Sequence, residues 1–161
     1  MVKDFCAKTE AACYERRMPT VHFQVETDQP PERVLALLTD FSDRRPELYG
    51  NIDRGHFKVH GQGPGWADVT EGNVLAWERS HYDWDASSGQ VTVQTVESDS
   101  WRPGSRWEYR LQPRANGGTQ VDVTVVRLPR TLRGRLIAIG LPFLGRRVLR
   151  RDLERVLRTS Q

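Results

Sequence analysis

Apolar and polar residues alternate along much of this chain, which is the period-2 pattern of a β-strand with one buried face. The pattern is clearest near the start, where Val21, Phe23 and Val25 share one face. Clusters of glycine, asparagine and serine separate six further runs and favour tight turns between them. The pattern therefore predicts seven strands, at residues 21–26, 57–60, 66–71, 75–84, 90–97, 106–111 and 119–127.

Other regions follow a helical period of three to four residues. A first helix is expected to begin at Pro30-Pro31, because proline suits the first helical turn, and a second short helix is expected at 44–49. From Arg130 to Arg158, apolar residues recur on one face and arginines on the other, which predicts a long amphipathic helix. Pro142 removes a helical hydrogen bond, so this helix should bend or break beside it.

These elements predict an α+β architecture, in which a seven-stranded antiparallel curved sheet surrounds a long C-terminal helix. Short turns between consecutive strands require antiparallel pairing. Two short helices lie between the first two strands, and the long helix, beginning near Thr131, should cross the concave face. A chain of 161 residues fits one domain, with residues 1–19 as an N-terminal extension and residues 20–161 as the folded unit.

Composition narrows the function classes. Hydrophobic residues make up 37% of the chain and charged residues 28%, which is typical of a globular protein. No apolar run reaches the roughly 20 residues that span a bilayer, and the first residues lack a signal-peptide pattern, so a cytoplasmic location is expected. Residues 127–161 contain ten arginines and two acids, for a net charge of +8, whereas the rest of the chain carries −5. Arginine outnumbers lysine twenty-one to three, so charge alone does not indicate a nucleic-acid partner.

Several segments resemble the START-like, or SRPBCC, superfamily, which includes polyketide cyclase/dehydrase proteins and Bet v 1-like allergens. The similarity spans about residues 20 to 158 and is carried by the segments 27–40, 77–79, 107–109 and 116–123 and by the amphipathic C-terminal end. The resemblance implies that the sheet grips the C-terminal helix and that the gap between them is a ligand cavity. A curved sheet cannot sit flush on a bent helix, which independently favours such a cavity.

Strand alternation nominates the residues that would line this cavity. Trp107 and Tyr109 share the apolar face of their strand, although plain core packing would explain them equally well. Residues 75–84 show no clean face, and a register slip of one residue would reverse any assignment. With the face that carries Trp77 turned inward, the predicted ligand-binding residues are Trp77, Arg79, His81, Trp107, Tyr109, Val123, Ile139 and Phe143.

Three functions remain open from the sequence. The first is binding of a hydrophobic or amphipathic small molecule, such as a lipid, a sterol-like compound or a polyketide. The second is an enzyme of the cyclase, aromatase or dehydratase type, in which His81, Tyr109 and Arg79 are the candidate catalytic residues. The third is a module that contacts a membrane surface weakly, or another protein, through the arginine-rich helix, although an apolar face packed on the sheet explains that pattern better.

The sequence predicts neither a metal nor a cofactor. His56 and His60 lack a third ligand at useful spacing, and the chain contains no nucleophile elbow, phosphate loop or zinc-protease motif. We expect no nucleic-acid partner, and either a monomer or a homodimer.

Overall fold

The computed structural model describes residues 19–140 and 145–158. Residues 1–18, 141–144 and 159–161 lie outside this description, so the predicted N-terminal extension stays a prediction. Phe143 and the bend expected at Pro142 also fall outside the described residues.

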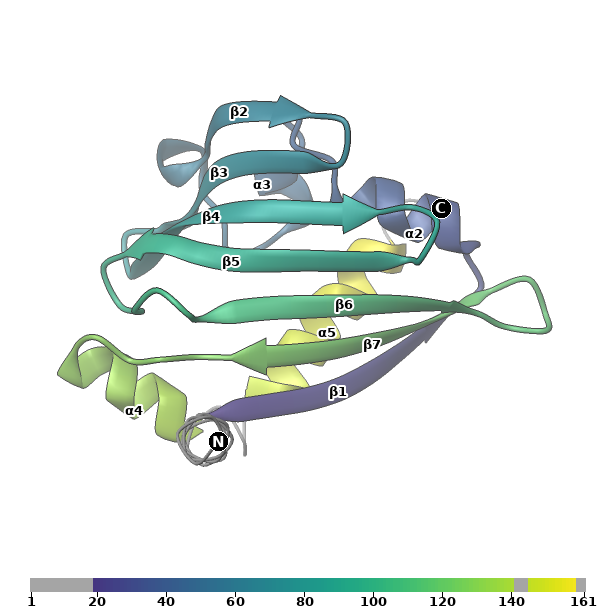
Figure 1. Cartoon of the computed structure of the whole chain (residues 1–161). Helices are drawn as coiled ribbons and strands as arrows, with labels where there is room; N and C mark the ends of the chain where they lie inside the picture. The colour runs from purple at the N-terminus through teal and green to yellow at the C-terminus, as the bar shows by residue number, and fades with distance from the viewer. Residues whose placement is uncertain (1–18, 141–144, 159–161) are drawn as a thin grey trace, which may run out of the picture.

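One seven-stranded antiparallel sheet forms the body of the molecule, as the sequence predicts (Figure 1). The strands lie in the order β1-β7-β6-β5-β4-β3-β2. After β1 the chain therefore crosses to the opposite edge of the sheet, where β2 lies, and the following strands are added one after another until β7 pairs with β1. Their bounds are β1 Thr20–Thr27, β2 Lys58–Gly63, β3 Trp66–Asn73, β4 Ala76–Asp85, β5 Gln90–Ser98, β6 Arg106–Pro113 and β7 Thr119–Val126.

Two strands end later in the chain than predicted. The strand predicted at 57–60 is longer in the structure, since β2 continues to Gly63 and the turn is made by Pro64 and Gly65. Gly65 has a φ of 83°, which glycine adopts without strain. The strand predicted at 66–71 is also longer, since β3 continues to Asn73. The turn at 74–75 follows, and the Asn73 side-chain oxygen accepts hydrogen bonds from the backbone N–H groups of Leu75 and Ala76.

Two short helices, α2 (Pro31–Leu38) and α3 (Arg45–Leu48), connect β1 to β2, followed by the 3₁₀ turn η1 (Arg54–His56). Proline occupies the first or second position of both helices, as expected from its fixed φ and missing N–H. Helix α2 buries Val34, Leu37 and Leu38 and packs against β6 and the C-terminal helix. These helices close one end of the space beneath the sheet.

Inward-facing residues of β1, β7 and β5 form much of the hydrophobic core. Val121, Val123 and Val125 on β7 are almost completely buried, and Val123 pairs with Phe23 of β1. On β5 the alternating residues Val91, Val93 and Thr95 are also buried, up to a bulge between β4 and β5 after which the faces exchange. The predicted alternation is therefore correct for these strands.

The C-terminal region forms two described helices, α4 (Leu132–Gly140) and α5 (Arg146–Arg158). Helix α5 crosses the sheet face and packs on β1 and α2, burying Leu153, Val156 and Leu157 (Figure 1). Helix α4 lies beside the end of the sheet instead (Figure 1). The predicted inward orientation of its large apolar residues is wrong, because Leu132, Leu136 and Ile139 are all more than 60% exposed.

Candidate functional site

A cavity of about 190 Å³ lies between the sheet, α3 and α5. Its wall is largely aromatic and aliphatic, and its polar groups come from side chains that project inward from the sheet and from α3. Such a concave, mostly apolar space with a few convergent polar groups is typical of small-molecule sites. The lining includes Phe23, Leu38, Tyr49, Ile52, Trp77, Tyr82, Val91, Val93, Trp101, Trp107, Tyr109, Leu149 and Leu153, together with Arg45, Glu71, Glu78, Arg127 and Asp152.

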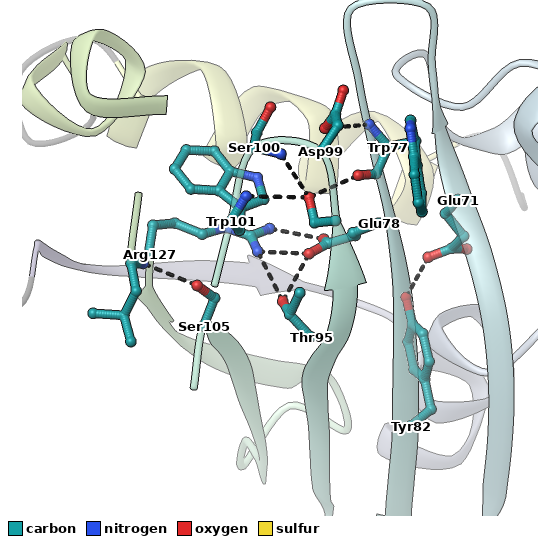
Figure 2. Close-up of polar contacts among 12 residues, drawn as sticks. Glu71, Trp77, Glu78, Tyr82, Thr95, Asp99, Ser100, Trp101, Ser105 and Arg127 are labelled. Atoms are coloured by element: carbon teal, nitrogen blue, oxygen red, sulfur yellow. Dashed lines mark hydrogen bonds and ion pairs between the residues drawn. The ribbon is translucent and has the colours of Figure 1, made fainter. Parts of the chain in front are cut away.

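A buried ion pair between Arg127 and Glu78 forms one polar wall (Figure 2). Arg127 follows the end of β7, so it continues the inward row of that strand. Its two terminal nitrogens donate to the two carboxylate oxygens of Glu78 over 2.8 and 2.9 Å. The Thr95 hydroxyl donates to the same carboxylate over 2.8 Å. This bidentate geometry satisfies the carboxylate on two sides, which a buried charge requires.

The Arg127 guanidinium also lies over two indole rings. Its central carbon is 5.2 Å from the Trp101 ring centre and 4.9 Å from that of Trp107. Cation–π contact adds to the ion pair in holding the side chain in place. Burial acts to raise the pKa of Glu78, but the Arg127 charge and the hydrogen bonds outweigh it and leave the pKa below its ordinary value. Glu78 is therefore ionised at neutral pH.

A second buried pair, Arg45 and Glu71, forms the wall nearer α3. The Tyr82 hydroxyl joins it, because it accepts from Arg45 over 3.1 Å and donates to Glu71 over 2.5 Å. Arg45 also donates to the carbonyl oxygens of Leu38 and Asp40, both at 3.1 Å. Burial opposes the Arg45 charge, but its partners, led by Glu71, raise the pKa well above its ordinary value.

The two glutamates are cross-strand neighbours. Glu71 on β3 pairs directly with Glu78 on β4 in the antiparallel register. Like charges at such positions destabilise a sheet, since their Cβ atoms lie within about 5.5 Å. Here each carboxylate has its own arginine, one supplied by α3 and the other by the segment after β7. The site therefore depends on parts of the chain that are far apart in sequence.

Two tyrosines, Tyr109 and Tyr49, also line the cavity. Tyr109 on β6 stacks parallel to Trp107, with ring centres 6.2 Å apart. Burial raises the pKa of Tyr109, and the neighbouring Tyr49 raises it further. Burial likewise raises the pKa of Tyr49. Both phenols therefore keep their protons and can donate a hydrogen bond to an acceptor oxygen.

The orientation expected for residues 75–84 is wrong. The inward face of β4 carries Glu78, Ser80 and Tyr82, of which Ser80 and Tyr82 are buried. Arg79 and His81 lie on the opposite face and do not line the cavity. His81 contacts Asp68 over 2.7 Å there. The physical reason is that polar groups occupy the inner face of β4, where Arg127 and Arg45 compensate the neighbouring carboxylates.

Of the other predicted ligand-binding residues, three line the cavity. Trp107 and Tyr109 do so from β6, and Trp77 does so at the end of the β3–β4 hairpin. Val123 lies in the hydrophobic core instead, and Ile139 is 68% exposed on α4. Phe143 is outside the described residues.

Sequence reasoning missed the two arginine–glutamate pairs and Tyr82. One signal was present, because alternation places Arg127 at the end of the inward row of β7. The alternative register of β4 would have placed Glu78 and Tyr82 on the same inward face. A single buried arginine needs an acid partner, so the two observations together would have favoured that register.

Metal ligands do not gather within the described residues, where no three histidine, cysteine or acidic side chains form a group suited to an ion. No helix in residues 19–140 or 145–158 is long and apolar enough to cross a membrane.

The fold is that of known proteins. The chain is similar to the Zhui aromatase/cyclase from Streptomyces sp. R1128, at 17% identity and a TM-score of 0.71 over 88% of this chain and 92% of that one. It is also similar to a START superfamily protein from Mycobacterium smegmatis, at 13% identity and a TM-score of 0.67 over 88% and 95% of the two chains. A truncated norcoclaurine synthase from Thalictrum flavum shares 11% identity, with a TM-score of 0.65 over 88% and 92%.

No protein-family model and no curated protein sequence matches the chain. The structural similarities establish the START-like, Bet v 1-like helix-grip fold that the sequence resembles.

Proposed function

We propose that this protein binds an apolar or amphipathic small molecule in the cavity between the sheet and α5. The observation that carries the proposal is an aromatic-walled hollow of about 190 Å³ in which polar groups converge. This volume is below the roughly 300–1,000 Å³ typical of pockets for drug-sized ligands. A ligand of one or two rings fits this space better than a long lipid chain or a sterol.

The polar groups favour an uncharged oxygen on the ligand. Both terminal nitrogens of Arg127 already donate to Glu78, and Arg45 is engaged by Glu71, Tyr82 and two carbonyl groups. Each guanidinium therefore already has a glutamate carboxylate as its counterion. The Tyr109 hydroxyl remains a donor, so a carbonyl or phenolic oxygen is the acceptor that it suits.

The structural neighbours support an aromatic, oxygen-bearing ligand. One of them acts as an aromatase/cyclase, and another structure of norcoclaurine synthase contains dopamine and hydroxybenzaldehyde. Such molecules combine a flat apolar ring with hydroxyl or carbonyl groups, as this cavity does with stacked Trp107 and Tyr109 beside the polar wall. A polyketide-like or phenolic compound is thus our preferred ligand class.

A cyclase or dehydratase activity ranks second. It needs a group that accepts a proton next to the bound carbonyl. His81, the expected base, lies on the other face of β4, and the cavity lining drawn from the described residues includes no histidine. Glu78 has a lowered pKa, which makes it a weak base, and the raised pKa of Tyr109 suits it as a donor. Binding and orientation are therefore better supported than proton abstraction.

Native mass spectrometry of the protein purified from its own host will show whether a small molecule is carried along. Binding of that compound, or of a phenolic aldehyde as a probe, is then followed by quenching of tryptophan fluorescence. Trp107→Ala should weaken binding about tenfold, because losing about 50 Å² of contact costs about 1.3 kcal/mol. Trp66→Ala is the matched control, since Trp66 stacks on His81 on the outer face.

Tyr109→Phe tests the polar contact without changing the shape of the wall. It should weaken binding of carbonyl and phenolic probes about fivefold, as expected for one neutral hydrogen bond, and leave a hydrocarbon analogue unaffected. Equal effects of the Trp66 and Trp107 substitutions would refute the location of the site. An unchanged affinity in Tyr109→Phe would refute the role given to its hydroxyl.

A further inference from the structure

Helix α4 turns its large apolar side chains toward the solvent and not toward the protein interior. The residues that it buries are small, Gly134 and Ala138, whereas Leu132, Leu136 and Ile139 are 73%, 66% and 68% exposed. A surface helix normally turns its large apolar residues inward. Burying them would gain far more than burying a glycine and an alanine, so this outward face is suited to an apolar environment outside the fold.

Close packing at Gly134 fixes this orientation. A Cβ atom built on Gly134 would lie 2.6 Å from the carbonyl oxygen of Ser100, so the helix approaches the β5–β6 connection through a residue without a side chain. The Thr131 hydroxyl accepts from the Gly134 backbone N–H over 3.1 Å and caps the first turn. Turning α4 over would bring larger side chains against Ser100. The leucines and isoleucines therefore stay outside.

The chain segment that contains this helix carries charge of one sign. Residues 128–151 contain seven arginines and no aspartate or glutamate. Arg133 and Arg135 lie on α4 itself, and Arg146 and Arg147 begin α5; all four are exposed. An anionic lipid bilayer offers a partner to both kinds of side chain, because exposed leucine and isoleucine enter the acyl boundary and arginines meet the headgroups.

We propose that α4 is a docking surface for membranes that contain anionic lipid, with Leu132, Leu136 and Ile139 inserted and Arg133 and Arg135 at the headgroups. The helix would lie in the plane of the interface, since no described helix is long enough to cross a bilayer. This inference is independent of the ligand proposed for the cavity.

Other occupants fit the surface less well. If this surface paired with the same surface of a second copy of the chain, the seven arginines of residues 128–151 in each copy would repel one another. Neither segment contains an acid to compensate that charge. A nucleic acid would satisfy the arginines but leave the exposed leucine and isoleucine side chains against water or phosphate. An anionic bilayer satisfies both the charge and the apolar surface.

Co-sedimentation of the full chain with vesicles tests the proposal. Vesicles of phosphatidylcholine with 30% phosphatidylglycerol should bind the protein at 0.1 M salt, and vesicles of phosphatidylcholine alone should bind it at least tenfold more weakly. Raising the salt to 0.5 M should release most of the protein. Leu136→Ser/Ile139→Ser and Arg133→Gln/Arg135→Gln should each lower the partition coefficient at least about tenfold.

Matched controls come from elsewhere on the surface. Val74→Ser/Leu75→Ser removes two other exposed apolar side chains, and Lys58→Gln/Arg110→Gln removes two other exposed positive charges. Neither should change the partition coefficient by more than twofold. The proposal is overturned if the full chain does not bind the anionic vesicles, or if the α4 variants bind as the controls do. It is also overturned if light scattering shows a dimer that the Leu136→Ser/Ile139→Ser variant dissociates.

Discussion

Removing the Arg127 guanidinium should destabilise the fold strongly at neutral pH. Arg127→Met keeps much of the apolar stem and the contact with Trp101 and Trp107 but leaves the Glu78 carboxylate without its counterion. Both hydrogen bonds from the guanidinium to that carboxylate would be lost, whereas the one from the Thr95 hydroxyl would remain. A buried charge that loses its partner must either stay ionised in an apolar site or take up a proton.

The magnitude follows from the burial of the pair. The side chains of Arg127 and Glu78 are 7% and 19% exposed. Breaking a buried pair costs about 3–5 kcal/mol, and the partial exposure of Glu78 places the expected loss near the lower end, at about 3 kcal/mol. For a chain of this size such a loss lowers the melting temperature by roughly 6–12 °C. Arg127→Met/Glu78→Gln removes both charges and should recover at least half of the loss.

Urea denaturation followed by tryptophan fluorescence measures these effects. The control is Arg54→Met, because Arg54 and Glu47 form an exposed pair at 68% and 61%, which should contribute less than about 1 kcal/mol. The pKa of Glu78 is lower in the folded protein than its value of 4.5 in the unfolded chain. The stability that the ionised Glu78 contributes is therefore complete above pH 4.5 and is lost as the pH falls through the lower pKa of the folded state. The loss caused by Arg127→Met should therefore be large at pH 7 and decrease as the pH falls below 4.5.

A loss below about 1 kcal/mol at pH 7 would contradict this reasoning. So would a loss that is the same at pH 7 and pH 4, or a double variant no more stable than Arg127→Met. Each result would show that Glu78 does not depend on Arg127 for its charge.

Two further predictions concern α4 and the outer face of the sheet. Gly134→Ala should lower the free energy of unfolding in urea by about 1–3 kcal/mol, because the added Cβ would meet the Ser100 carbonyl. Gly140→Ala is the control and should not destabilise the protein, since no atom lies within 4 Å of its added Cβ. A Gly134→Ala variant more stable than the wild type would disprove the close approach. The Asp68 carboxylate, its hydrogen-bond partner, raises the pKa of His81 above 6.5, so NMR titration should show that pKa fall in Asp68→Asn. The stability contributed by the charged His81 is complete below pH 6.5 and is lost as the pH rises through the raised pKa of the folded state. A difference in stability between the wild type and Asp68→Asn that does not change with pH would contradict this prediction.

The strands could be predicted from sequence because each has a local pattern. On β7 the valines at 121, 123 and 125 alternate with polar residues, and nothing inside the molecule interrupts that order. On β4 the same rule fails, because the inner face holds Glu78 and the outer end holds Trp77. The ion pair that permits Glu78 to face inward joins residues 49 positions apart, and a local pattern does not contain that information.

The C-terminal helix shows a different limit. The periodicity of the sequence identifies the apolar residues of this helical region. It does not show whether those residues pack on the sheet or face the solvent. The rule that apolar faces point inward holds for Leu153 and Val156 on α5, which cover the sheet. It fails for Leu136 on α4, where the tight contact at Gly134 sets the rotation of the helix. Predicting that contact requires the position of Ser100, which lies 34 residues earlier in the chain.

The direct pairing of Glu71 with Glu78 also bears on how the protein folds. The β3–β4 hairpin is local, and hairpins of this kind form within about 1–10 μs when nothing opposes them. Before Arg45 and Arg127 arrive, however, closing this hairpin brings two carboxylates together across the ladder. We therefore expect the hairpin to be formed weakly in the transition state, with the ends of the chain docking first, and mild acid to speed its closure by protonating one of the two glutamates.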